Sequence, residues 1–458
     1  MHGVQYIMKK DLNMSNLAKY RIPSCYTFAF SICVSFIVIA LFLDTPVNIA
    51  HNFVTIYTSR SVLITDYVAL AGVSATLLNS AVSGIIFLLI LIKSKSVPNG
   101  KIIAAIFLVI GFSLFGKNMF NSFPIILGVW LYGKINKIKF SDLLAQVMIA
   151  GTISPIVSEI AFLGDNTSVE KILAAYGTGI FIGLIFPIVS EATKKMHRGY
   201  CLYNGGIAGG FIATFFVGLL RSFGIELLPE NFWDTTHSSF MAIFAYSLAV
   251  VLIIYGLIRN KPKTAILRYM DLLNEKDVNN NDYYAKYGTV CYINIGIMCI
   301  IATSVMLFLK APINGPVLGG ILTISGFAAA GKHPKNAIPV FIGSMAAAVL
   351  NFPDTNYPLN SLAILFSTGL APVAGRYGWI AGIVAGFFHV SVALFIGDLN
   401  GGLNLYNNGF AGGFVVITIV PVIVFVRNYI LKNTIDEHSV SANESLSRDK
   451  EENNEDLP

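Results

Sequence analysis

Charged residues are scarce in this chain of 458 residues. Only 12% are Asp, Glu, Lys or Arg, about half the share found in an ordinary soluble domain. A soluble protein of this size could not cover its surface with so few charges. Disorder of the whole chain is also excluded, because disorder requires low hydrophobicity, whereas 55% of these residues are hydrophobic. What remains is an all-α polytopic membrane protein.

Cysteines and catalytic motifs are sparse as well. The five cysteines lie mostly within or beside apolar segments and form no CxxC pair, so we expect packing residues and no disulfides or metal ligands. There is no HExxH or GxSxG motif, and neither Gly-Lys pair is followed by the Ser or Thr of a phosphate-binding loop. We therefore expect no catalytic residue, no metal and no cofactor. Basic residues in short loops do not indicate a nucleic-acid partner.

Hydropathy divides the chain into about fourteen apolar segments. They lie near residues 26–43, 68–92, 102–115, 119–133, 143–162, 172–190, 200–220, 239–258, 287–309, 316–330, 337–351, 359–375, 378–396 and 405–426. A helix needs about 20 residues to cross a bilayer. Two pairs are clearly shorter, 102–115 with 119–133 and 316–330 with 337–351. Each pair is either two short spans or one re-entrant hairpin.

The distribution of basic residues predicts the orientation. With a cytoplasmic N-terminus over 1–25, most Lys and Arg residues fall on the cytoplasmic side, including those of loop 259–286. Linker 221–238 is then external and rich in acidic residues. This agrees with the positive-inside rule and predicts that both termini are cytoplasmic. The polar, acid-rich tail 427–458 is predicted to be disordered.

The chain contains an internal duplication. Residues Asn99–Gly128 match Asn314–Gly343 at ten of thirty positions, with an offset of 314 − 99 = 215. Residues Gly199–Phe211 match Gly402–Phe414 at nine of thirteen positions. Unrelated segments of ordinary composition would share roughly two of thirty. The match is therefore far above chance and indicates two copies of one unit.

The two copies form a first membrane repeat at 26–220 and a second at 239–426. Each holds seven apolar segments, or five spans plus one re-entrant hairpin. Either number is odd, so successive copies must insert in opposite orientations. Such inverted repeats are typical of transporters and channels, whose solute site lies near the midplane between the copies. Membrane scaffolds and enzymes with similar duplications remain alternatives.

A duplicated motif, Tyr-Asn-x-Gly-x-Ala-Gly-Gly-Phe, opens the last segment of each repeat. Its glycines weaken a helix, and broken backbone in lipid is tolerated only against protein or a water-filled cavity. One interpretation is an unwound segment that lines a solute pathway. The other is close helix packing with asparagine as a cap. The candidate pathway residues are Asn204, Gly206, Gly209, Gly210, Asn407, Gly409, Gly412 and Gly413.

A second pair of features surrounds the short segments. Asn99 and Asn314 precede them, and Lys117 and Lys332 follow their Gly-x4-Gly junctions. If the short pairs are hairpins, two lysines and two helix N-termini face each other inside the protein and favour an anion. If they span the membrane, each lysine simply reaches water at a helix end.

Few ionisable residues lie in or near the apolar segments. Glu159, Glu191, His389 and Asp398 are the candidates. The first three are candidates for ion or proton coupling, although each could instead lie at the membrane interface. The scarcity of acids argues against a pump for multivalent cations and favours a small neutral or anionic solute.

The paired motifs LYNGGIAGGF and LYNNGFAGGF, with GFSLFGK and GFAAAGK, resemble a family of membrane proteins. It is the bacterial family catalogued as domain of unknown function 1576, in which the domain occurs twice. The resemblance covers most of the chain and implies a multipass protein of the bacterial cell membrane, with no known activity. A weaker similarity is to urea transporters, although their threonine-rich proline motif is absent here.

Together these features predict a membrane transport protein, either a secondary transporter or a channel. The solute is small and neutral or anionic. The expected partners are the lipid bilayer and that solute, and a homo-oligomer is left open. The alternatives are a membrane scaffold or partner subunit and a membrane-embedded enzyme.

Overall fold

The computed structural model describes residues 22–63, 65–164, 167–226, 232–276, 282–351 and 357–452. Within them every regular element is a helix. The first half contains α2 (Ser24–Leu43), α3 (Pro46–Thr58), α4 (Tyr67–Lys93), α5 (Gly100–Phe112), α6 (Met119–Ile135), α7 (Phe140–Ala150), the 3-10 turn η1 (Gly151–Ile153), α8 (Pro155–Ala161), α9 (Val169–His197) and α10 (Asn204–Ser222).

The second half repeats this order with few changes. It contains α11 (Ser238–Ile258), α12 (Pro262–Leu272), α13 (Tyr283–Tyr287), η2 (Gly288–Val290), α14 (Cys291–Phe308), α15 (Gly315–Gly326), η3 (Phe327–Ala329), α16 (Pro334–Asn351), α17 (Tyr357–Ser367), η4 (Thr368–Leu370), α18 (Ala371–Tyr377), α19 (Trp379–Ile396), η5 (Gly397–Leu399) and α20 (Asn407–Glu452). Most of the predicted N-terminus, and parts of linker 221–238 and loop 259–286, lie outside the described residues.

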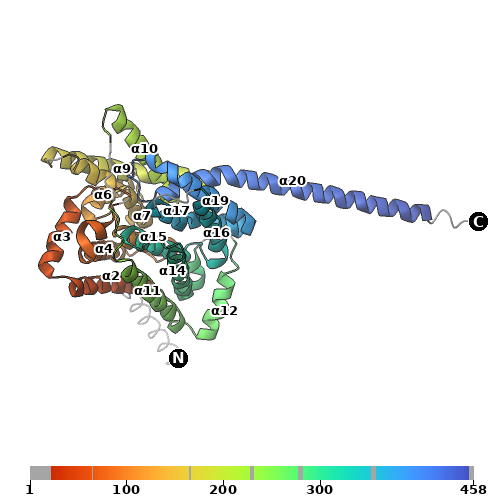
Figure 1. The fold of residues 1–458 in the computed structure, drawn as a ribbon, viewed down its shortest axis with the longest axis horizontal. Helices are drawn as coiled ribbons and strands as arrows, with labels where there is room; N and C mark the ends of the chain where they lie inside the picture. The colour runs from red at the N-terminus through yellow and green to blue at the C-terminus, as the bar shows by residue number, and fades with distance from the viewer. Residues whose placement is uncertain are drawn as a thin grey trace, which may run out of the picture.

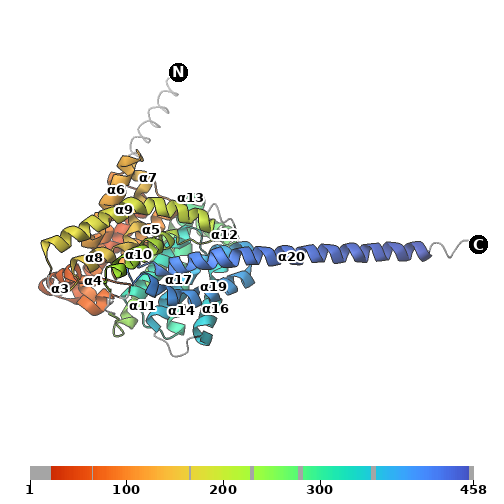
Figure 2. The ribbon, with the colours of Figure 1, turned by 90° about the horizontal axis from the view of Figure 1, so that it is seen from above.

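Helix packing in one half is repeated in the other. Helix α2 packs on α4 as α11 packs on α14, and α6 packs on α9 as α16 packs on α19. Figures 1 and 2 show α3 and α4 at one end of the body and α16 and α19 at the other. The duplicated sequence therefore folds into two similarly packed groups of helices.

The two groups meet at α5 and α15, which pack against each other in opposite chain directions. The start of α5 at Gly100 lies against Ala329, just after α15, and the start of α15 at Gly315 lies against Leu114, just after α5. Between these two ends, the backbones of α15 and α5 are in direct contact at Gly319 and Gly111. A Cβ on Gly319 would lie only 2.6 Å from the Gly111 carbonyl oxygen. Every residue of α15 is buried.

Eight helices in the described part of the chain are long and apolar enough to cross a membrane. The bent pair formed by residues 140–153 and 155–161 would make a ninth span, with a bend of 45°. Fourteen spans are thus not confirmed. Helices α5 and α15 have 13 and 12 residues, which at about 1.5 Å per residue is less than the roughly 30 Å of a bilayer core.

The last helix, α20, extends beyond the predicted second repeat. It continues to Glu452, and in Figures 1 and 2 its second half projects away from the body. A nucleated helix propagates easily because each further residue adds one hydrogen bond. The helix therefore covers most of the tail 427–458, and the disorder of that tail stays a prediction.

The contact between α5 and α15 predicts the effect of a single methyl group. We expect Gly319→Ala to lower the free energy of unfolding by about 1–3 kcal/mol, because the added Cβ forces two backbones apart. Gly218→Ala is the matched control, since a Cβ on Gly218 would meet no heavy atom within 4 Å. Thermal unfolding of both variants in detergent measures the difference. Equal stability of the two variants would mean that this close contact is absent.

Candidate functional site

Each repeat has a turn after its short buried helix, and an asparagine from a long helix holds that turn. We call residues 113–118 the first junction and residues 328–333 the second junction. In the first, the side-chain amide of Asn79 donates to the carbonyl oxygens of Ser113 (2.7 Å) and Lys117 (2.9 Å). One buried amide thus satisfies two carbonyls to which lipid could not donate.

The second junction repeats this arrangement. The side-chain amide of Asn294 donates to the carbonyl oxygens of Ala328 (2.8 Å) and Lys332 (2.7 Å). Asn294 and Asn79 are 294 − 79 = 215 positions apart, the same offset as the two lysines. Sequence reasoning missed both asparagines, although a search at that offset over the long segments would have found them.

A second asparagine stabilises each junction from the following helix. Asn121 donates to the carbonyl oxygen of Gly116 (3.1 Å), and Asn336 donates to that of Gly331 (3.0 Å). Gly116 has φ 64° and Gly331 has φ 113°. Only glycine adopts such a backbone without strain, which explains why a glycine precedes each lysine.

Lys117 of the first junction is fully buried. Its Nζ donates to the carbonyl oxygen of Met148 at 3.2 Å and lies 5.1 Å from the centre of the Phe87 ring. Gly151 leaves room for the amine, because a Cβ there would lie 2.3 Å from Nζ. The interpretation that this lysine simply reaches water is therefore wrong.

Lys332 of the second junction is also fully buried. Its Nζ contacts the Thr368 hydroxyl at 2.8 Å and the Tyr203 hydroxyl, and it lies 4.7 Å from the centre of the Tyr203 ring. Among the described residues, neither Lys332 nor Lys117 belongs to an ion pair. Two buried amines without a carboxylate partner are thus the most unusual feature of the protein.

Aromatic rings from both repeats pack between the junctions. The rings of Tyr203 and Tyr406 are 4.7 Å apart, Phe327 lies 4.9 Å from Tyr203, and Phe112 lies 5.4 Å from Tyr406. Phe366 contacts both tyrosines, at 5.9 and 5.5 Å. Lys332 therefore lies beside an apolar cluster to which both repeats contribute, whereas the ring beside Lys117 is that of Phe87.

Backbone hydrogen bonds also cross between the repeats near these rings. The Leu202 amide donates to the Gly369 carbonyl (2.9 Å), and the Leu405 amide donates to the Thr152 carbonyl (2.8 Å). Leu202 and Leu405 occupy the same position in the two copies of the duplicated motif. The segment just before α10 is thus hydrogen-bonded to the second repeat, and the segment just before α20 is hydrogen-bonded to the first.

The motif glycines lie inside or at the start of α10 and α20, where the two helices touch. A Cβ on Gly206 would lie 2.8 Å from the Cα of Gly409, and the reverse distance is the same. The other candidates also contact neighbouring residues closely: Gly209, Gly210, Gly412 and Gly413. Their packing role is evident here, and their place along a solute pathway stays a prediction.

The motif asparagines hold the starts of the same helices. The Asn204 side-chain oxygen accepts from the Thr193 hydroxyl (2.9 Å) and lies 3.0 Å from the His197 ring, which ties α10 to α9. The Asn407 oxygen accepts from the Asn400 amide at 2.6 Å. Asn204 is partly buried and Asn407 is buried, and a contact of either with solute is also untested.

Asn99 and Asn314 cap α5 and α15, since each side-chain oxygen accepts the backbone amide three residues ahead, at 2.9 and 3.2 Å. A second cap comes from the other repeat. Asp282 of the second repeat accepts the Gly100 amide at the start of α5 (2.8 Å). A carboxylate of the second repeat therefore caps the N-terminus of the short helix of the first repeat.

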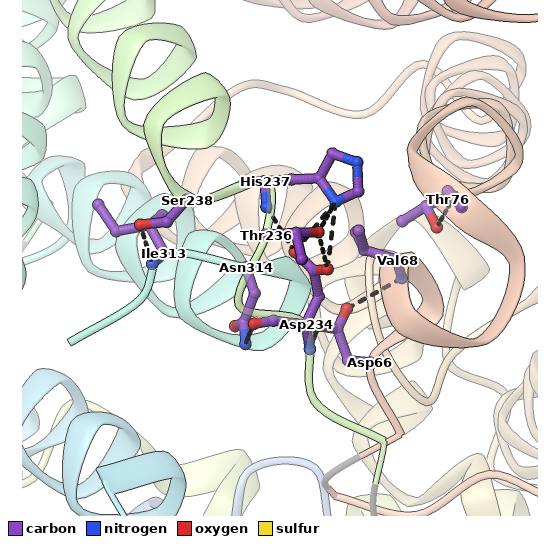
Figure 3. Close-up of polar contacts among 10 residues, drawn as sticks. Asp66, Val68, Thr76, Asp234, Thr236, His237, Ser238, Ile313 and Asn314 are labelled. Atoms are coloured by element: carbon purple, nitrogen blue, oxygen red, sulfur yellow. Dashed lines mark hydrogen bonds and ion pairs between the residues drawn. The ribbon is translucent and has the colours of Figure 1, made fainter.

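The reciprocal cap is formed by Asp66 of the first repeat, which hydrogen-bonds the Gly315 amide at the start of α15. Figure 3 shows its carboxylate beside Val68 and Asp234, whose backbone amides it accepts at 2.9 Å each. Burial raises the pKa of the Asp66 carboxyl to about 7, although these amides favour the charged form. Asn314 donates to the Asp234 carbonyl at 3.0 Å, which joins the linker to the same cap.

Of the coupling candidates, Glu159 forms an ion pair with Arg60 at 2.7 Å. The pair borders a cavity of about 150 Å³ that Ser59, Thr65 and Phe232 also line. Glu191 is exposed on α9. His389 is fully buried on α19, beside Asn408. Coupling of ions or protons through these residues stays a prediction.

Polar groups continue from each junction toward a loop. Asn118, after Lys117, donates to the Tyr67 hydroxyl at 3.4 Å, and that hydroxyl lies 3.1 Å from the Ser61 hydroxyl. At the equivalent place in the second repeat, the His333 ring stacks on Tyr283 with centroids 6.1 Å apart. The two junctions thus have matching surroundings, with histidine replacing asparagine in the second.

Comparison with protein families assigns the chain. A family model described as protein of unknown function (DUF1576) matches residues 45–222 and 261–425. The chain belongs to this family. The two matched ranges of DUF1576 agree with a duplicated domain, so the resemblance predicted from the paired motifs is confirmed. No curated protein and no solved structure matches the chain.

The asparagines that hold the junctions predict a loss of stability when truncated. We expect Asn79→Ala and Asn294→Ala each to lower the free energy of unfolding by about 1–3 kcal/mol or more, because two buried carbonyls lose their donor. Asn136→Ala is the control, since this exposed amide bonds only one carbonyl within its own helix. Denaturant or thermal unfolding in detergent measures the change. A loss of stability no larger than that of the control would contradict the proposed role of these two asparagines.

Proposed function

We propose that this protein transports a small neutral or anionic solute along the interface between two inverted repeats in the bacterial cytoplasmic membrane. The observation that carries the proposal is the pair of buried lysines, Lys117 and Lys332, at equivalent junctions with no carboxylate bonded to either amine. Burying an amine in this way is costly, and ionisable groups inside a membrane protein usually serve a function.

The inverted arrangement is supported by equivalent features in opposite directions. Helices α5 and α15 occupy the same position in the two repeats and run antiparallel. Lys95 and Lys310 end α4 and α14 in left-handed turns, with φ of 51° and 53°. If the copies are inverted, these turns lie on opposite sides of the membrane. The positive-inside pattern then gives cytoplasmic termini.

The chemistry of the junctions suits a solute with hydrogen-bond acceptors or a negative charge. Each lysine lies two residues before the start of a helix, α6 or α16. The partial positive charge of a helix N-terminus adds to that of an ammonium. The side-chain oxygens of Asn79 and Asn294 are buried without a hydrogen-bond partner. They could accept from a donor group of the solute or from water.

Removal of either amine tests the proposal directly. We expect Lys117→Met and Lys332→Met to reduce solute uptake into proteoliposomes at least about tenfold, because one removed charge-assisted hydrogen bond contributes roughly 1.5–3 kcal/mol. The panel of solutes includes urea, formate, acetate, nitrate and chloride. Lys134→Met is the control, since Lys134 is exposed and its Nζ lies over Trp130.

The alternatives give different results in the same assay. A scaffold or partner subunit would give no uptake of any solute by vesicles that hold only this protein. A membrane enzyme would turn over a lipid-borne substrate without net uptake. Uptake that both lysine variants retain in full would contradict a pathway past the junctions.

A further inference from the structure

The amine of Lys332 differs from that of Lys117 in its partners. It contacts two hydroxyl groups, those of Tyr203 and Thr368. Lys117 contacts a carbonyl oxygen, that of Met148. A hydroxyl can donate or accept a hydrogen bond, whereas a carbonyl only accepts. The two lysines are therefore equivalent in sequence but not in the protonation states that their surroundings allow.

The groups that face Lys332 carry no fixed negative charge. Cys201 and Tyr203 approach from the segment before α10, and the Tyr406 ring lies behind that of Tyr203. Helix α14 contributes the neutral amide of Asn294, which binds the lysine's own carbonyl. Burying an ammonium without a counter-charge in such surroundings is unfavourable.

The neighbouring residue does not supply that charge. The ring of His333 points to Glu275, with its Nε2 3.1 Å from the Glu275 carbonyl oxygen, and not to Lys332. Glu275 lies near Lys286 and Tyr287, which its carboxylate contacts. The Glu275 carboxylate is therefore already paired with Lys286 and Tyr287, and the Asp282 carboxylate accepts the Gly100 amide.

The hydrogen bonds around Lys332 form a complete chain for a neutral amine. The Tyr203 hydroxyl can donate to the nitrogen lone pair, and the amine can donate to Thr368 at 2.8 Å. The Thr368 hydroxyl donates onward to the Leu365 carbonyl at 2.9 Å. An ammonium has no lone pair, so the Tyr203 proton would have to turn to the Tyr406 hydroxyl or to Thr368, at 3.4 Å, which is long for such a bond.

We infer that Lys332 binds a proton together with a small monovalent anion, so that proton and anion enter and leave the second junction as a pair. On binding, the nitrogen lone pair takes the proton and an ammonium forms beside the anion. On release, the new N–H bond breaks and the proton leaves with the anion. The inference rests on the proposed function and adds the charge of the solute and its coupling to protons.

Lys117 does not share this role. The position equivalent to Thr368 is Gly151, which has no hydroxyl and lies against the amine. Among the residues that the structure describes, the Lys117 amine hydrogen-bonds only the Met148 carbonyl, so it acts as a donor. The first junction then provides a fixed donor, and the second provides the proton-binding amine.

The affinity for anions as a function of pH tests this inference. The full-length protein in detergent is titrated with chloride, nitrate, formate and acetate between pH 6 and 9. When one proton binds with each anion, affinity falls about tenfold per pH unit above the pH at which the amine loses its proton. We expect that slope for at least one of the four anions. A flat profile, or no binding of any of them, would overturn the inference.

Two variants separate Lys332 from the other amines. Lys332→Arg cannot lose its proton, so its anion affinity should not change with pH, whereas Lys117→Arg should keep the slope. If Lys332→Arg does not fold, Tyr203→Phe gives the second test. Removing the hydroxyl that donates to the amine favours protonation, and the fall in affinity should begin at higher pH. A slope retained in Lys332→Arg, or an unshifted profile in Tyr203→Phe, would contradict the assignment.

Transport measurements distinguish failure of this inference from failure of the proposed function. Uptake into proteoliposomes with a flat pH profile would leave the proposed function intact and remove only the coupled proton. Absence of uptake for every solute would instead contradict the proposed function, whatever the pH dependence of binding.

Discussion

Two helices too short to cross a bilayer end inside this protein, and lipid offers no hydrogen bonds to the polar groups at their ends. The rest of the structure depends on that constraint. Asn79 and Asn294 satisfy the carbonyls of the two junctions, and Asp66 and Asp282 cap the two short helices from the opposite repeat. Each repeat completes the other, so neither could bury its short helix alone.

The contacts between the two repeats also assemble the candidate site. Because α5 and α15 pack in opposite directions, the two junctions lie at opposite ends of the pair. Lys332 lies beside aromatic rings from both repeats, and Lys117 lies beside the Phe87 ring. Broken backbone, fixed donors and helix N-termini are thus gathered at the interface between the copies, as in transporters built from inverted repeats.

The duplication, the helical class and the Gly-Lys junctions could be predicted from the sequence, because they depend on hydropathy and on an offset between similar residues. The number of spans could not, since an apolar segment reads the same whether it meets lipid or buried protein. Asn79 and Asn294 were missed because a lone asparagine in a long apolar segment does not reveal its partner. The difference between Thr368 and Gly151 could be recognised only in the folded structure, because only there do these two residues lie beside Lys332 and Lys117.

The central claim is that the two copies lie in the membrane in opposite orientations, with their junctions at opposite ends of the α5–α15 pair. The most direct measurement is the labelling of Lys95→Cys and Lys310→Cys by a membrane-impermeant thiol reagent. Both positions are exposed turns, and the five native cysteines are buried. The account predicts that one variant is labelled only from outside intact cells and the other only after the inner face is opened. Labelling of both from the same side would contradict it.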